Sequence, residues 1–114
     1  MRSTSGFGRL RALAVTTDKS WRGFAELSPV GKFLPGYEAT NWFGIVAPAK
    51  TPVQAIELLN KAIAACLAEP NISAKMATLG GDALVGSPAE FGKLIADETG
   101  KWGRVVRTAN IKTG

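Results

Sequence analysis

The sequence predicts an α/β fold with three strands and three helices in the order β-β-α-α-β-α. Three observations lead to that prediction. Apolar residues recur at helical spacing after Pro52, a short apolar run at 41–47 is bounded by residues that interrupt regular structure, and residues 87–90 have the form of a helix capping box. The 114 residues are 46% apolar and 20% charged, a composition typical of one globular domain.

The N-terminal part of the chain opens with a predicted strand. Arg9 to Thr17 (RLRALAVTT) becomes apolar toward its end and is followed by a polar stretch, which favours a strand. From Trp21 to Lys32 the pattern is irregular. Pro29 and Gly31 favour a loop there, with about one helical turn.

The run from Leu34 to Pro52 (LPGYEATNWFGIVAPAKTP) predicts a turn followed by the second strand. Pro35 fixes its own φ and Gly36 accepts a positive φ, which is turn chemistry. Residues 41–47 are rich in aromatic and β-branched side chains, which favour a pleated surface. Pro48 then ends the strand, because proline cannot donate to a sheet ladder.

The most regular pattern predicts a helix from Pro52 to about Glu69. Thr51 is expected at the N-cap, Pro52 at the first helical position and Gln54 three residues after the cap, as in a capping box. The apolar side chains of this helix recur at intervals of three and four residues: Val53, Ile56, Leu59, Ile63, Cys66 and Leu67.

Two further helices and one strand are predicted after Pro70, which should stop the first helix. Asn71 is expected to cap a second helix that runs through Leu79 and ends at the Gly80-Gly81 pair. Residues 82–86 are long enough for one short strand. A second capping box then begins a long helix to about Thr108.

Residues 9–114 are expected to form a single α/β domain, and residues 1–8 a disordered N-terminal segment. The N-terminus lacks the apolar core of a secretory signal, and no apolar stretch approaches the length of a membrane span. Nothing in the chain as written predicts export, which favours a cytoplasmic location for the chain by itself.

The charge and the single cysteine indicate no special chemistry. Fourteen basic and nine acidic residues give a net charge of +5. The positive residues are scattered and do not interleave with aromatic ones, so a solvated surface is favoured over nucleic-acid binding. Cys66 has no histidine anywhere in the chain to activate it and is predicted to be a small core residue.

No enzyme site, metal site or cofactor is predicted. Without histidine there is no nucleophile–histidine arrangement and no histidine metal ligand. Asp97 and Glu98 are adjacent on a helix and point about 100° apart, so they do not form an acid–base pair. The Gly80-Gly81 pair lacks the other residues of a phosphate-binding loop.

One polar and aromatic cluster remains as a candidate ligand site: Thr40, Asn41, Trp42 and Phe43. It lies where a loop enters the second predicted strand. Hydroxyl and amide groups there are suited to hydrogen-bond a small ligand, with aromatic rings over it. The alternative is that Trp42 and Phe43 pack beneath the helix that begins at Pro52.

Several motifs together resemble one protein family. They are RLRALAVTT, LPGYEATNWFGIVAPAKTP, the LLNKAI and LAEP parts of the first helix, LGGDALVGSPAEF and KWGRVV. In this order and spacing they resemble the solute-binding receptors of tripartite tricarboxylate transporters, the Bug receptors. The resemblance runs from about Arg9 to the end of the chain, and PGYEA-x-x-WFG-x-x-AP is its most specific segment.

The resemblance implies a partial lobe of the type II periplasmic-binding-protein kind, matching the C-terminal part of a two-lobe receptor. Such receptors are periplasmic, are not enzymes, and capture small carboxylates for a membrane transporter. It implies a ligand role here only for Thr40, Asn41, Trp42 and Phe43. We therefore expect a receptor fragment that does not bind a carboxylate alone. The alternative is an interaction module that forms a homodimer through exposed strand edges, exchanging the strand at 9–17.

Overall fold

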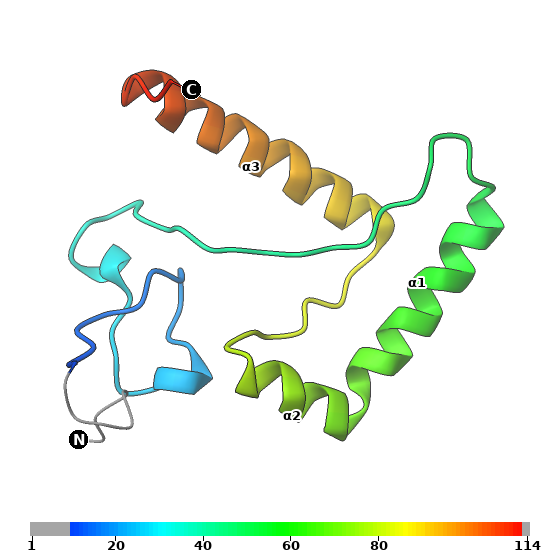
Figure 1. Ribbon diagram of the computed structural model, residues 1–114, viewed down its shortest axis with the longest axis horizontal. Helices are drawn as coiled ribbons and strands as arrows, with labels where there is room; N and C mark the ends of the chain where they lie inside the picture. The colour runs from blue at the N-terminus through cyan, green and yellow to red at the C-terminus, as the bar shows by residue number, and fades with distance from the viewer. Residues whose placement is uncertain (1–9, 113–114) are drawn as a thin grey trace. The chain divides into compact units, whose positions relative to one another are not determined.

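The computed structural model describes residues 10–112, and the chain divides into two compact units (Figure 1). The first unit ends at Val46 and the second begins at Ala47. The expected disordered segment 1–8 lies outside the described residues, and the expectation of a single domain over 9–114 stays a prediction.

The first unit is held by short-range hydrogen bonds around one parallel bridge between Val15 and Pro29. The Val15 N–H donates to the Ser28 carbonyl (3.1 Å), and the Val30 N–H donates to the Val15 carbonyl (2.8 Å). Single 3₁₀ turns precede and follow Pro29, η1 at Arg22–Phe24 and η2 at Val30–Lys32. The irregular pattern of 21–32 is therefore confirmed as loop with short helical turns.

The small core of this unit forms around Leu27, which is only 6% exposed. The Leu27 N–H donates to the Phe24 carbonyl at 2.9 Å, which closes a tight turn directly before this residue. The rings of Trp21 and Phe24 meet edge to face, with centroids 5.4 Å apart. Such aromatic pairs add to the stabilisation that burial alone provides.

The predicted turn at Leu34-Pro35-Gly36 is confirmed. The Tyr37 N–H donates to the Leu34 carbonyl at 3.0 Å, and Gly36 has a φ of 85°. These are the features of a type II turn, which requires a positive φ at its third residue. The turn directs the chain into the extended stretch that contains the candidate site.

The second unit begins with α1, Val53–Ala68, which confirms the first predicted helix. The predicted capping box at Thr51 is wrong. Pro52 is the N-cap and makes no side-chain cap, and the Thr51 hydroxyl donates instead to the Pro48 carbonyl at 2.8 Å. The cause is a tight turn before the helix, in which Lys50 has a φ of 70° and the Thr51 N–H also bonds to Pro48.

Helix α2, Pro70–Thr78, follows α1 after a single extended residue, Glu69. Its predicted cap, Asn71, is already helical, because Pro70 occupies the first turn, where its missing N–H costs nothing. The Gly80-Gly81 signal is confirmed. Gly80 has a φ of 82°, and the Gly81 N–H donates to the Met76 carbonyl at 2.9 Å, as in a Schellman motif.

Helix α3, Pro88–Thr108, has the predicted capping box. The Ser87 side chain accepts from the Glu90 N–H (3.1 Å), and the Ser87 N–H donates to the Glu90 carboxylate (2.7 Å). Asn110, with a φ of 51°, ends the helix in a left-handed conformation. The Asn60 side chain of α1 donates to the Gly86 carbonyl at 2.9 Å, which ties the start of α3 to α1.

The three predicted strands do not form within residues 10–112. Residues 10–17 have a single bridge at Val15, and residues 41–47 and 82–86 are extended without a ladder (Figure 1). The expected order β-β-α-α-β-α is therefore not confirmed, although the three helices follow one another as expected. The physical reason is that a strand needs neighbours, and isolated extended segments are not stable as a sheet.

Many apolar side chains stay exposed in the described part of the chain. Cys66 is exposed, so its prediction as a core residue is wrong. Phe43 is 94% exposed and Leu84 76%, and Leu27, still 6% exposed, is the one buried apolar residue between residues 10 and 112. Among the described helices, none is long and apolar enough to cross a membrane.

Candidate functional site

The candidate site, residues 40–43, belongs to the first unit and follows the turn at Gly36. The Ala39 N–H donates to the Thr16 carbonyl at 2.9 Å, which places the start of the segment beside residues 15–16. Gly31 lies close to the backbone just before the segment, since a Cβ at Gly31 would come within 2.9 Å of the Tyr37 carbonyl oxygen. The close approach explains why a glycine suits this position.

Burial alternates along the segment. Thr40 and Trp42 are half-buried, whereas Asn41 and Phe43 are exposed. Successive side chains of an extended chain point to opposite sides, which accounts for the alternation. The four predicted residues therefore do not share one face of the segment. Thr40 and Trp42 lie on one side, and Asn41 and Phe43 lie on the other. The alternative, that Trp42 and Phe43 pack beneath the helix that begins at Pro52, stays a prediction.

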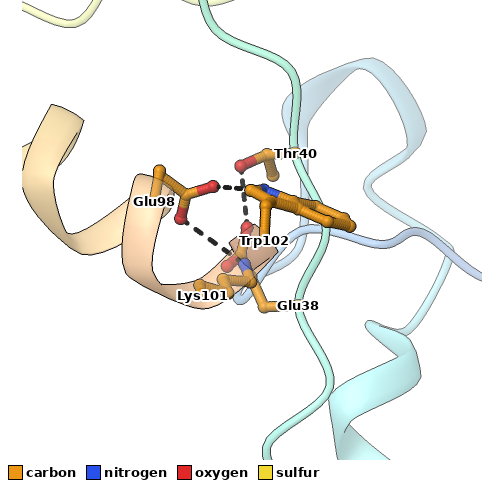
Figure 2. A network of polar contacts seen from close by, with 5 residues as sticks. All are labelled: Glu38, Thr40, Glu98, Lys101 and Trp102. Atoms are coloured by element: carbon orange, nitrogen blue, oxygen red, sulfur yellow. Dashed lines mark hydrogen bonds and ion pairs between the residues drawn. The ribbon is translucent and has the colours of Figure 1, made fainter. Parts of the chain in front are cut away.

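The Thr40 hydroxyl already has a partner that sequence reasoning missed. It donates to Glu38 Oε1 at 2.7 Å (Figure 2). Glu38 and Thr40 are two residues apart in an extended segment, and this spacing is the signal that could have identified the pair. A carboxylate ligand at Thr40 would meet the negative charge of Glu38, so the side-chain amide of Asn41 is the better donor for an anion.

A second polar cluster lies on α3, within the second unit. The indole Nε1–H of Trp102 donates to Glu98 Oε2 at 2.7 Å (Figure 2). Lys101 Nζ lies 3.5 Å from the other carboxylate oxygen of Glu98 and 5.4 Å from the centroid of the Trp102 ring. One carboxylate thus holds both neighbours one turn along the helix.

The remaining titratable groups offer little further chemistry. No cluster of three or more histidine, cysteine, aspartate or glutamate side chains suited to a metal ion occurs among residues 10–112. Hydrogen bonding from Ser87, its backbone N–H first and its side chain second, lowers the pKa of Glu90. That shift belongs to the capping box and not to a ligand site.

Two proteins from Bordetella species are similar to nearly the whole of this chain. The chain is 30% identical to a UPF0065 protein of Bordetella bronchiseptica over 105 residues, 92% of this chain and 31% of that protein. It is 30% identical to protein BugT of Bordetella pertussis over 106 residues, 92% of this chain and 32% of that protein. The chain therefore spans about a third of the length of these two relatives.

A solved structure, R. palustris Rpa4515 with adipate, has the same fold over the part that matches. The TM-score is 0.72 at 34% identity, and the match covers 88% of this chain and 34% of that one. This likeness supports the expected partial lobe of the periplasmic-binding-protein kind.

The family profile described as "Tripartite tricarboxylate transporter family receptor" matches residues 3–111. That match covers nearly the whole chain and agrees with both Bordetella relatives and with the adipate-bound structure. The chain therefore belongs to the receptor family of the tripartite tricarboxylate transporters, the Bug receptors.

Proposed function

We propose that this chain supplies one part of a solute-binding receptor for small carboxylates, with residues 40–43 as one wall of the ligand site. The observation that supports the proposal is the likeness to Rpa4515, a structure with adipate, at 34% identity over 88% of this chain. Adipate is a linear dicarboxylate. In the whole receptor the ligand would be passed to membrane transporter subunits, from a periplasmic location.

The exposed side of the segment has the chemistry that a dicarboxylate needs. The side-chain amide of Asn41 offers two N–H donors to a carboxylate, and the ring of Phe43 offers an apolar surface to the alkyl chain between the carboxylates. Thr40 and Trp42 lie on the more buried side. We propose that these two side chains hold the segment in its extended conformation.

We further propose that the chain by itself does not bind the ligand. It spans 34% of Rpa4515, so a receptor of that size has many other residues available to enclose a ligand. A pocket usually buries most of its ligand's surface, which a single extended segment does not do. Binding and release make and break no covalent bond, so the proposed role is not enzymatic.

Isothermal titration of the chain with adipate, succinate and citrate tests the incompleteness. We expect no measurable binding, and a micromolar dissociation constant would overturn this part of the proposal. The ligand wall is tested in a chimera in which this chain replaces the matched part of Rpa4515. We expect adipate binding by the chimera, weakened about tenfold by Asn41→Ala.

Two matched variants make the chimera informative. Asn71→Ala removes an exposed amide outside residues 40–43, and Phe33→Ala removes an exposed ring. Both should leave adipate affinity unchanged, whereas Phe43→Ala should lower it. Equal effects at Asn41 and Asn71 would contradict a ligand role for residues 40–43.

The homodimer alternative is less well supported. It depended on exposed strand edges, and no strand forms in the part of the chain that is described. It now depends on exposed apolar side chains such as Leu79 and Phe43. Light scattering that finds a monomer at high concentration would remove it.

A further inference from the structure

The end of α3 carries most of the net charge of the chain. Residues 99–112 contain four basic side chains, those of Lys101, Arg104, Arg107 and Lys112, and no acidic one. The rest of the chain has ten basic and nine acidic side chains, a balance of +1. Basic residues are scattered along the whole chain, but the last acidic residue is Glu98, and this difference makes the charge local.

Three of these four cations have no partner in the described part of the chain. Arg104, Arg107 and Lys112 are exposed, and their side chains make no hydrogen bond or ion pair within residues 10–112. Lys101 differs, because its side chain contacts Glu98 at 3.5 Å and is only 27% exposed. We call the three free cations the basic surface.

Both arginines of the basic surface lie along α3 over glycines. A Cβ at Gly103 would lie 3.4 Å from Arg107 Nη1, and a Cβ at Gly100 would lie 3.7 Å from Arg104 Nη1. Each arginine thus extends back over the glycine four residues before it, in the direction that helical side chains take. Because neither glycine has a side chain, the two guanidinium groups form a low cationic strip along the helix.

The basic surface is on the polar face of α3. The apolar side chains of the same part of the helix are those of Trp102, Val105 and Val106. At about 100° per residue, they lie about 100–160° around the helix from Arg104 and Arg107. The apolar stripe of an amphipathic helix packs on the rest of a protein, and the opposite face meets solvent. The exposure of the arginines therefore follows from their place on the polar face and not from the share of a receptor that this chain spans.

The helix dipole accounts for only part of the basic surface. Cations complement the dipole within the last turn of a helix. Helix α3 ends at Thr108, so Arg107 is in that turn, whereas Arg104 precedes it and Lys112 follows the helix. Two of the three free cations are thus left without a structural reason.

We propose that the basic surface is a docking surface for an anionic lipid bilayer. Basic side chains next to a membrane are attracted by acidic headgroups, and each cation raises the partition coefficient about fivefold. The chain belongs to a receptor family of membrane transporters, so a bilayer surrounds the partner of the whole receptor. Three cations give weak and reversible attachment, which suits a receptor that must also leave the membrane.

An acidic protein segment is a poorer occupant. Carboxylates are recognised best by paired N–H donors of arginine in a fixed orientation. Here no hydrogen bond within residues 10–112 fixes the guanidinium group of Arg104 or Arg107. Attraction to a charged bilayer needs the charge alone and no fixed geometry.

The test is co-sedimentation of the whole chain with lipid vesicles. One set contains phosphatidylcholine with about a third phosphatidylglycerol, and the other contains phosphatidylcholine alone. We expect binding to the anionic vesicles only, and a partition coefficient at least about tenfold lower at about 0.5 M salt than at about 0.05 M, because salt screens exposed charges.

Three double variants make the result specific. Arg104→Gln with Arg107→Gln should lower the partition coefficient about twenty- to thirtyfold. Lys61→Gln with Lys75→Gln removes the same charge from exposed positions in α1 and α2 and should change it less than about twofold. Arg104→Lys with Arg107→Lys keeps the charge and should retain binding. Circular dichroism should show unchanged helix content in all three, since lysine and glutamine are good helix formers.

Several outcomes would overturn the inference. Equal losses in the two glutamine double variants would show that the total charge of the chain, and not the basic surface, causes binding. Equal binding to both kinds of vesicle would exclude attraction to acidic headgroups. Binding of a poly-glutamate peptide without binding of anionic vesicles would identify an acidic protein segment as the occupant. Failure of the adipate titration or of the chimera leaves the inference standing, because no vesicle measurement involves the ligand.

Discussion

Trp102 donates its indole N–H to Glu98 across one turn of α3, with 2.7 Å between Nε1 and Oε2. This contact gives the single polar group of the indole a charged acceptor, while the ring remains available for apolar contacts. Lys101 contacts the other oxygen of the same carboxylate at 3.5 Å. The orientation of the Trp102 ring is therefore set within its own helix, by residues three and four positions apart.

Replacing Glu98 by alanine should release the Trp102 indole to water. We expect an upfield shift of its indole N–H resonance and a loss of about 0.5–1 kcal/mol in the free energy of unfolding. Proton–nitrogen correlation spectra resolve the three indole groups, and Trp102→Phe assigns the relevant one. Glu98→Gln keeps an uncharged acceptor and should shift the resonance less. An unchanged resonance in Glu98→Ala would show that the contact does not persist in solution.

Replacing Ser87 by alanine should destabilise α3. The variant leaves the Glu90 N–H without its side-chain acceptor, and lost N-caps cost about 1 kcal/mol. Chemical denaturation measures the change, and Ser87→Thr is the control because its hydroxyl retains the acceptor. Equal losses in both variants would contradict capping as the cause.

The stability of α3 should fall in acid because of Glu90. The Ser87 backbone N–H, and then its side chain, hydrogen-bond the charged carboxylate and hold the pKa of Glu90 below its ordinary value of 4.5. A carboxyl with a lowered pKa in the folded state stabilises above pH 4.5, and this contribution is lost as the pH falls through the folded value. Helix content followed by circular dichroism should therefore be level near neutral pH and decline below about pH 4.5.

Two variants separate this effect from other titrations. Glu90→Gln has no charge at this position, so its helix content should decline less in acid than that of the unaltered chain. Ser87→Ala keeps the backbone N–H that contributes most to the shift, so it should retain much of the acid dependence. Identical acid profiles for the unaltered chain and Glu90→Gln would exclude Glu90 as the cause.

The helices were predictable because their signals are local. The capping box at Ser87 and the Gly80-Gly81 pair are set by residues within one turn of each helix end, and both form as expected. The error at Thr51 has an equally local cause, since the preceding turn takes its hydroxyl as a donor to Pro48. The Thr51 hydroxyl could serve either the helix cap or the preceding turn, and in the structure it bonds within the turn.

The strands and the candidate site were less predictable because they depend on distant partners. Residues 41–47 have the composition of a strand, but composition supplies no neighbouring strand, and none lies beside Phe43 in the described structure. The four site residues were expected to form one cluster, yet extended geometry sends Thr40 and Asn41 to opposite sides. The Glu38 partner of Thr40 follows from the same geometry, but the sequence does not show that the two side chains bond.

Two glycines with equal space around them should respond in opposite ways to alanine. A Cβ at Gly92, in α3, or at Gly80, after α2, would meet nothing within 4 Å. They differ in backbone, because Gly80 has a φ of 82° whereas Gly92 is helical. Gly92→Ala should raise the free energy of unfolding by about 0.5–1 kcal/mol, since alanine loses less conformational freedom in a helix. Gly80→Ala should lower it by about 1 kcal/mol, since a left-handed conformation costs alanine that much. Chemical denaturation of both variants against the unaltered chain measures the difference, and a shift of the same sign in both would contradict the backbone explanation.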